Sequence, residues 1–526
     1  MDVPSRQAAV ARIEQVLARE LGTIHKDWGG RIPIALAYPN TYHLGMSNLG
    51  MHTIYSLFNR YPDFVCERVF YDSFGLSLES ARGLMEFPVV AFSFSFEEDY
   101  QRAVEMLRLA RIPLYAEERD ETYPLLIAGG AAVTANPEPL APFFDAFALG
   151  DGEALIPPLV ELLRWGLTES RDALLRQLAA LPGMYVPRFY GVEHGDDGLI
   201  TSINPQPGVP YPVHRQYAPN LDGFPVASVI FTPDTEFGDM YLMEVERGCW
   251  RGCRFCLAGQ IFRPFRARSL PTLLALARQG LMHRRRVGLV GSAVFDYPQL
   301  KELLAGLEGM GARVSTPSLR LDALTDDLLR VLKAGRSRTV TLAPEAGSLR
   351  LRRLLGKPFS DQVIYRAVEK VESYGFAELK LYFMLGLPEE GKADIQALAC
   401  LAKQLRSLFS RLLVIQLTPF VPKAQTALER VPMASRTVLR ERMDYLKVEL
   451  GRAGMRVRAE SPRWMEIQGL LARGDRRLAQ ALASLQGRSL SHWQRALASA
   501  RIEPGFYLAR ERSPDEILPW DVVAGP

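Results

Sequence analysis

The sequence predicts an α/β protein made of two consecutive units, an N-terminal doubly wound, Rossmann-like domain and a partial (β/α)6 barrel, followed by a small helical C-terminal extension. In the first third of the chain, nearly continuous apolar runs alternate with helical patterns, which is typical of buried parallel strands. After a proline-rich interval, six further strand patterns follow between residues 241 and 419, usually with a helical pattern behind them. Six such units in succession favour a curved, partial barrel over a flat sheet.

The chain begins with an amphipathic pattern. Val10, Ile13 and Leu17 recur at helical spacing, so residues 1–29 are expected to hold a helix that packs on the following domain. This segment lacks the apolar core of a secretory signal, and no apolar run in the chain approaches the roughly 20 residues that span a bilayer. We therefore expect a cytoplasmic protein with no membrane partner.

Residues 30–165 form the first predicted domain. From residue 166 to residue 235 prolines become dense and periodicity is poor, so this part is expected to be a connecting region with little regular structure. Within the first domain the strands are expected at 31–37, 89–94 and 124–130, and the helices at 48–60 and 99–110.

The predicted barrel covers residues 236–450, and residues 451–526 are expected to form the basic, helical extension. In such barrels the chemistry lies at the carboxyl ends of the strands, which directs attention to the loops that follow them. The six expected strands are 241–247, 287–293, 313–318, 338–344, 379–385 and 412–419.

The composition is that of a globular protein, with 48% hydrophobic and 23% charged residues, and it gives no support for extensive disorder. The net charge of +4 is too small for this length to indicate nucleic-acid binding by itself. Arginine runs such as 350–353 are typical of solvated faces, but next to a strand end they also leave an anionic substrate open.

Three of the five cysteines lie within eight positions, directly after the first barrel strand. Cys249, Cys253 and Cys256 form a C-x-x-x-C-x-x-C pattern. A structural zinc site needs four ligands, and the nearest histidine, His283, lies well outside this loop. A [4Fe-4S] cluster has four irons, so three thiolates leave one iron open to chelate a small molecule. Unligated thiols, or a zinc site completed by a distant side chain, are the alternatives.

At these residues the chain resembles the radical S-adenosylmethionine (SAM) enzymes. Their signature, C-x-x-x-C-x-aromatic-C after the first barrel strand, is matched by Cys249, Cys253, Phe255 and Cys256. The resemblance implies that the open iron binds SAM and that reductive cleavage yields a 5′-deoxyadenosyl radical. It also implies an electron donor such as flavodoxin or ferredoxin.

The resemblance implies further contacts to SAM at strand ends. Gly291 and Ser292 occupy the place of a Gly-Gly-Glu turn that holds the methionine amino group, but Ala293 replaces the acidic residue. For Glu345 and Glu389 a purely structural role, as a helix cap or a loop-ordering carboxylate, is the alternative. The residues assigned to SAM in this way are Phe255, Gly291, Ser292, Glu345, Gly386 and Glu389.

The first domain resembles the cobalamin-binding domains that precede many radical SAM barrels. On this resemblance Gly129 and Gly130 would allow close approach of the corrin or its nucleotide tail, with Ser93 at the end of the preceding strand. The histidine motif D-x-H-x-x-G is incomplete, because His43 and Gly45 are present without the aspartate. Either cobalamin binds without a histidine ligand, or the domain keeps the fold and has lost the cofactor.

The leading hypothesis is a radical SAM enzyme that modifies an unidentified substrate, with RNA and protein both open. A cobalamin-dependent radical SAM methyltransferase is the first alternative. A non-catalytic iron-sulfur protein that transfers electrons or scaffolds a partner is an alternative of another class. Methylthiolation is not favoured, because Cys66 and Cys400 alone cannot supply a second three-cysteine cluster.

Overall fold

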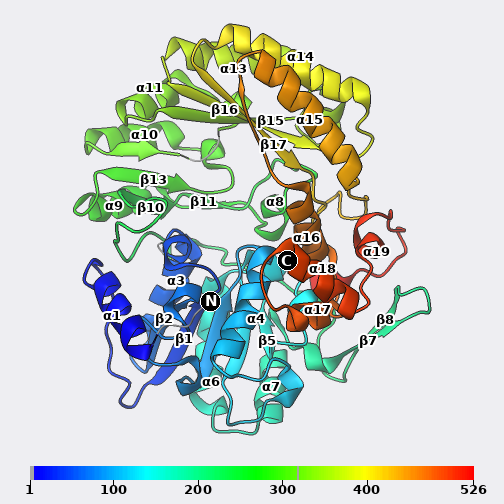
Figure 1. Cartoon of the computed structure of the whole chain (residues 1–526). Helices are drawn as coiled ribbons and strands as arrows, with labels where there is room; N and C mark the ends of the chain where they lie inside the picture. Colours follow the sequence, from blue (N-terminus) through cyan, green and yellow to red (C-terminus); the bar gives the residue numbers. More distant parts are fainter. Residues whose placement is uncertain (1–4, 225, 317–318, 526) are drawn as a thin grey trace.

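The computed structural model describes residues 5–224, 226–316 and 319–525. The N-terminal domain lies at the bottom of Figure 1, the open barrel lies at the top, and the red C-terminal segments lie where the two meet. The predicted fold class is confirmed, since a doubly wound domain precedes a curved parallel α/β unit that does not close into a full barrel.

The N-terminal domain is built on a six-stranded sheet in the order β2-β1-β3-β4-β5-β6. Its strands are parallel except for β6, which runs antiparallel to β5. Because helices cover the sheet, the strands are buried along most of their length, as their continuous apolar runs require. The strands are β1 (Ile32–Tyr38), β2 (Phe64–Phe70), β3 (Val89–Ser93), β4 (Leu125–Gly129), β5 (Ala146–Ala148) and β6 (Met184–Tyr185).

The strand order fixes where a ligand can bind. The chain moves from β1 to β2 in one direction and then returns to β3 on the other side of β1, so the order reverses between β1 and β3. Crevices form at the carboxyl ends of strands beside such a switch point. The helices of this domain are α1 (Arg6–Leu17), α2 (Tyr42–Gly45), α3 (Leu49–Asn59), α4 (Tyr100–Leu109), α5 (Ala131–Ala135), α6 (Gly152–Gly166) and α7 (Arg171–Ala180).

The first domain extends beyond residue 165, where the sequence analysis ended it. Helix α7 begins after Ser170, whose hydroxyl accepts from the backbone N–H of Ala173 at 3.4 Å, and β6 then joins the sheet. A two-residue strand has no periodicity that a sequence could reveal. The expected connecting region also contains the β7–β8 hairpin, with β7 at Tyr190–His194 and β8 at Ile200–Pro205, and the short β9 (Val213–His214).

The barrel strands form two parallel sheets, β10-β13-β14 and β15-β16-β17-β18, which an isolated bridge between Leu319 and Leu342 joins. Pro317 and Ser318, at the end of the predicted strand 313–318, lie outside the described residues. The strands are β10 (Met240–Glu244), β13 (Arg286–Val290), β14 (Arg313–Ser315), β15 (Thr339–Glu345), β16 (Glu378–Leu385), β17 (Leu412–Pro419) and β18 (Arg456–Ala459).

Strand β18 corrects the predicted end of the barrel at residue 450, because it pairs with β17 over four residue pairs. Its alternation of partly buried and exposed residues gave no apolar run to detect. The helices of this unit are α8 (Ala258–Ile261), α9 (Leu270–Leu281), α10 (Leu300–Gly309), α11 (Asp326–Ala334), α12 (Leu349–Leu354), α13 (Asp361–Ser373), α14 (Lys392–Leu408) and α15 (Arg436–Arg452).

The C-terminal segments join the two units. Asn136 of the N-terminal domain donates to the carbonyl oxygens of Ala472 and Gly474 at 3.2 and 2.9 Å, and Arg476 pairs with buried Glu138 at 2.8 Å. None of the described helices combines the length and apolarity needed to cross a membrane. The elements are α16 (Pro462–Arg473), α17 (Leu478–Ser484), α18 (Leu490–Ser499), α19 (Pro504–Leu508) and β19 (Val523–Ala524), which pairs with β9.

Gly130→Ala is expected to destabilise the N-terminal domain. Gly130 has a φ of +108°, and a Cβ atom there would lie 2.4 Å from the carbonyl oxygen of Phe94. Backbone strain of this kind costs on the order of 1–3 kcal/mol, so the midpoint of thermal unfolding should fall. Gly129→Ala is the matched control, because its Cβ would make an ordinary contact at 3.5 Å with the carbonyl oxygen of Ala148. Equal midpoints for the two variants would contradict this account.

Candidate functional site

The three clustered cysteines lie in the loop that follows the short strand β11 (Glu246–Arg247), and all three are partly buried. Two of their sulfur atoms already accept backbone hydrogen bonds, Cys249 from Arg251 and Cys256 from Gly259, both at 3.4 Å. Hydrogen bonds to cysteine sulfur tune iron-sulfur clusters. The loop therefore presents its thiols in an environment that fits cluster ligands.

The cysteine loop is tied to three other loops of the barrel. Arg251, between the first two cysteines, pairs with Asp296 after β13 and lies 3.4 Å from Asp322 after β14. The backbone N–H of Arg254 donates to Leu355 at the end of α12, at 3.0 Å. These contacts fix the loop at the carboxyl ends of successive strands, where barrel chemistry is found.

Among the described residues, no three His, Cys, Asp or Glu side chains are grouped in a way that could hold one metal ion. A [4Fe-4S] cluster makes a different demand, because each cysteine binds a different iron. Three thiols spread along a single loop satisfy that demand without converging on one point. The donor set of this loop thus fits a cluster that has one iron without a cysteine ligand.

A cavity of about 560 Å³ lies between the N-terminal domain and the barrel. It opens along the face of the N-terminal sheet at the switch point, where small residues such as Ala91 and Ala148 leave room above the strands. Both units supply the predicted binding residues, and the five that line this one cavity are Ser93, Gly129, Gly130, Gly291 and Ser292.

Glu246 lines the same cavity and was not predicted from the sequence. Its side chain is 1% exposed, and one carboxylate oxygen accepts from the backbone N–H of Ala293 in the turn that starts at Gly291. A Cβ atom at Gly291 would lie 2.2 Å from that oxygen, so any other residue would force the carboxylate to move. The other oxygen has no hydrogen-bond partner among the described residues, and burial raises the pKa of Glu246 to about 7.

Glu246 therefore places an acidic group at the turn whose own acidic residue is absent. It reaches the turn because Val245, directly before β11, donates its backbone N–H to the carbonyl oxygen of Val290 at the end of β13, at 2.8 Å, while β11 itself pairs antiparallel with β12 (Arg266–Ala267). A buried carboxylate oxygen without a partner is costly, so a ligand group that donates hydrogen bonds is favoured there. The local sequence does not single out Glu246, because the strand pattern 241–247 also carries Glu244 and Arg247.

Arg247, the next residue, joins the two units at the cavity wall. Its guanidinium lies 3.1 Å from Asp151 and 2.7 Å from Glu153, both at the start of α6 in the N-terminal domain, and 2.9 Å from Glu244 of β10. Arg266 forms a second ion pair with Asp151. All of these side chains are largely buried, so the charges have little access to water and each depends on its partners.

Phe255 and Glu345 lie together, linked by Lys357. The Lys357 ammonium is 2.6 Å from the carboxylate of Glu345 and 5.8 Å from the ring centroid of Phe255. Glu345 has a φ of +69° at a register shift in the β15–β16 pair, a strained conformation of the kind found at functional sites. Burial raises the pKa of Glu345, and Lys357 opposes that change.

Gly386 and Glu389 are not brought to the other predicted residues. The Glu389 carboxylate is 70% exposed and pairs with Arg350 at 3.0 Å, which is the loop-ordering role weighed above. Its neighbour Glu390 is the buried carboxylate of this turn, and it accepts from the backbone N–H of Gly386 at 2.9 Å. His43 also lies outside the cavity, held at 2.9 Å from Asp234.

Two family models match the chain. The model of "Radical SAM proteins, N-terminal" matches residues 50–187, and the model of the "Radical SAM superfamily" matches residues 243–402. The protein MJ0966 of Methanocaldococcus jannaschii is 31% identical over 458 residues, which are 85% of this chain and 90% of that protein. This chain belongs to the radical SAM superfamily. As a radical SAM protein it uses a [4Fe-4S] cluster and SAM, and it is an enzyme rather than a non-catalytic carrier or scaffold.

A further relative and a solved structure share less with this radical SAM enzyme. The protein named "uncharacterized methyltransferase PH0819", from Pyrococcus horikoshii, is 22% identical over 294 residues, which are 53% of this chain and 58% of that protein. The solved structure of the cobalamin-dependent radical SAM enzyme OxsB with aqua-cobalamin bound has a TM-score of 0.49 and 14% identity, over 80% of this chain and 56% of that one. The chain thus covers little more than half of the length of each of these two proteins.

Glu246→Gln is expected to change how stability depends on pH. The folded-state pKa of Glu246, about 7, is raised above its ordinary value of 4.5, so its favourable contribution is present below pH 4.5 and is lost as the pH rises to about 7. A shift of this size corresponds to at most about 3 kcal/mol. Relative to the glutamine variant, the wild-type unfolding midpoint should fall across this range and then level off.

The matched control is Glu117→Gln, which changes an exposed carboxylate on the N-terminal domain. Its unfolding midpoint should follow that of the wild type at every pH. If Glu246→Gln also follows the wild type from pH 4 to pH 8, the account of a buried, destabilised carboxylate is wrong.

Proposed function

We propose that the enzyme binds its cluster at the cysteine loop, binds SAM on the barrel side of the interdomain cavity, and modifies an unidentified substrate. One observation carries this proposal, namely that residues assigned to SAM and residues of the N-terminal sheet line a single cavity beside that loop. When cluster and SAM are bound and an electron is supplied, for example by flavodoxin or ferredoxin, they furnish a 5′-deoxyadenosyl radical for hydrogen abstraction.

In this proposal Cys249, Cys253 and Cys256 each hold one iron. Glu246 accepts hydrogen bonds from the amino group of SAM, because its free oxygen is buried at the turn of Gly291 and lines the cavity. A hydrogen-bond donor placed there also favours the ionised form of the carboxylate, which burial alone disfavours. The protein's part is thus to position SAM and to exclude water from the cavity.

Phe255 offers a partly buried ring next to the last cysteine, in the apolar cluster around Leu355 and Phe420. This surface suits the adenine that the family resemblance assigns to it. The Glu345–Lys357 pair closes the same side of the loop at 2.6 Å. RNA and protein both stay open as substrates.

The second candidate function is cobalamin-dependent methyl transfer. It is favoured by the extension of the cavity over the face of the N-terminal sheet, where the small residues Ser93, Gly129 and Ala148 lie side by side in register and leave space. The name of the Pyrococcus horikoshii relative, a methyltransferase, points in the same direction. No histidine lines this cavity among the described residues, so a corrin bound there would take no histidine ligand from its walls.

Loss of the three cysteines should abolish SAM cleavage. Anaerobically reconstituted protein with SAM and a strong reductant is expected to form 5′-deoxyadenosine, and the triple alanine variant of Cys249, Cys253 and Cys256 to form none. Cys400→Ala is the control, because this exposed cysteine on α14 lies outside the loop and should leave both iron content and cleavage unchanged. Cleavage by the triple variant at the wild-type rate would refute the proposed ligand set.

The methyltransferase candidate predicts that protein produced with excess cobalamin retains a corrin absorbance spectrum. Ala91→Leu should abolish that retention, because the larger side chain fills the space above the sheet. Normal SAM cleavage by the same variant would show that the barrel is intact. A wild-type protein that retains no corrin would dispose of the cobalamin hypothesis and leave the cavity to the substrate.

A further inference from the structure

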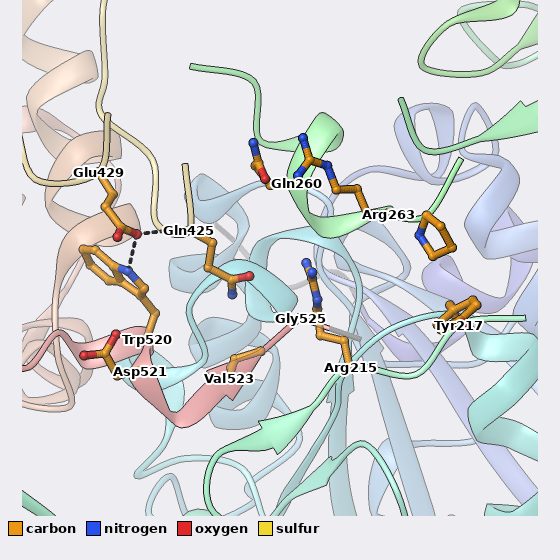
Figure 2. A pocket seen from close by; sticks show the side chains of 11 residues that line it. Arg215, Tyr217, Gln260, Arg263, Gln425, Glu429, Trp520, Asp521, Val523 and Gly525 are labelled. Carbon is orange, nitrogen blue, oxygen red and sulfur yellow. Dashed lines mark hydrogen bonds between the residues drawn. The ribbon is translucent and has the colours of Figure 1, made fainter. Parts of the chain in front are cut away.

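A second cavity, of about 650 Å³, shares no lining residue with the first. Figure 2 shows that it is formed by four separate segments: residues 215–217, residues 260–264 around the end of α8, residues 425–429 after β17, and the C-terminal residues 520–525. The C-terminal extension therefore builds a wall of a site that neither the N-terminal domain nor the barrel forms alone.

Arg215 lies in the middle of this cavity and has no partner for two of its nitrogen atoms. Its side chain is only 7% exposed, yet Nε and Nη1 make no hydrogen bond to any described residue. Its backbone N–H donates to Ala524 at 3.1 Å, so the C-terminal strand fixes its position. Asp151 is the carboxylate that interacts electrostatically with Arg215, but it already forms ion pairs with Arg247 and Arg266. Burying a guanidinium without hydrogen-bond partners or a counter-charge is costly, so a bound anion would stabilise Arg215.

Arg263 adds a second positive charge on the same side of the cavity (Figure 2). Its exposed side chain makes no ion pair in the described structure. Burial, together with the charge of Arg263, lowers the pKa of Arg215 to about 10. Two guanidinium groups that repel each other are best neutralised together by a dianion. Phosphate carries up to two charges and accepts paired hydrogen bonds from guanidinium groups.

The opposite wall presents hydrogen-bond acceptors. One oxygen of Glu429 accepts from the indole N–H of Trp520 and from the backbone N–H of Gln425, both at 2.7 Å, which aims this carboxylate along the cavity wall. Asp521 lies beside it. These carboxylates suit hydroxyl or amino groups of a ligand and repel a second phosphate. They therefore disfavour a nucleic-acid strand, whose phosphates would follow one another through the site.

We propose that this cavity binds a small phosphate ester that carries hydroxyl or amino groups, of the size of a sugar phosphate or a mononucleotide. The phosphate lies between Arg215 and Arg263, and the polar end of the ligand faces Glu429 and Asp521. The volume is within the range of sites for small molecules, roughly 300–1,000 Å³. This site is independent of the radical chemistry and does not rest on the proposed function.

The test measures binding to the full-length protein by calorimetry. The probes are inorganic phosphate, ribose 5-phosphate and adenosine monophosphate, with ribose and adenosine as phosphate-free counterparts and a short single-stranded RNA as the nucleic-acid arm. The phosphorylated small molecules should bind, their phosphate-free counterparts should not, and the RNA should bind more weakly than the mononucleotide.

Arg263→Gln should weaken the binding of the phosphate esters by about tenfold or more, since a charge-assisted hydrogen bond is lost. Arg215→Gln should weaken this binding in the same way. If that variant fails to fold, Arg263→Gln alone decides the test, because the Arg263 side chain is exposed and its replacement should not affect folding. Arg285→Gln, an exposed arginine outside both cavities, is the control and should bind as the wild type does.

Three results would each overturn the proposal. The first is that no phosphate ester binds at millimolar concentration. The second is that the phosphate-free counterparts bind equally well, and the third is that Arg263→Gln and Arg285→Gln bind the phosphate esters with equal affinity. Tighter binding of the RNA than of the mononucleotide would overturn the assignment to a small ester and favour a nucleic-acid ligand.

Discussion

The ion pairs of Arg247 with Asp151 and Glu153 hold the two units together at the place where both line one cavity. Three of these charges are nine-tenths buried or nearly so, and removing one partner from such a network typically costs about 3–5 kcal/mol, because the others lose their compensation. Arg247 stands two residues before Cys249, so the same contacts fix the start of the cysteine loop relative to the N-terminal sheet. Arg247, Asp151 and Glu153 all line the cavity, so these ion pairs help to define its shape.

The C-terminal segments stabilise this arrangement from the other side. Arg476 reaches Glu138 and the carbonyl oxygen of Tyr190, and Trp493 donates to Gln101 at 3.0 Å, so both contacts cross from the extension to the N-terminal domain. Lys423, in the loop after β17, adds a third link at 2.7 Å from Glu97. Because these links are hydrogen-bonded and largely buried, the two units behave as parts of one ligand-binding body.

Much of the fold, and the cysteine loop of the site, could be predicted from the sequence. Parallel strands that are buried on both faces appear in the sequence as apolar runs. The cysteine spacing is a local pattern that can be recognised without knowledge of the fold. The misplaced boundaries at residues 165 and 450 have a common cause, since β6 and β18 are only two and four residues long and are strands because they pair with a neighbouring strand. The local periodicity of a sequence does not reveal such pairing.

The site shows the same limit. Glu246 could not be assigned to the site from its neighbours in the sequence, because its proposed role depends on a contact with the turn at Gly291, 45 residues later. Glu389 shows the reverse case, since its motif matched in part while its carboxylate lies in solvent beside Arg350. Arg215 carried no motif at all and became informative only when its burial and its unpaired nitrogen atoms were known.

The central claim is that SAM occupies the cavity at the domain interface and contacts Glu246. The most direct measurement is the dissociation constant of SAM for reconstituted wild-type enzyme, Glu246→Gln and Glu389→Gln at equal cluster content, followed through the spectroscopic change of the cluster. The account predicts that Glu246→Gln binds SAM about tenfold or more weakly, as expected for losing a hydrogen bond to an ionised carboxylate, while Glu389→Gln binds as the wild type does. Unchanged affinity in Glu246→Gln, or a loss confined to Glu389→Gln, would place SAM elsewhere and contradict the account.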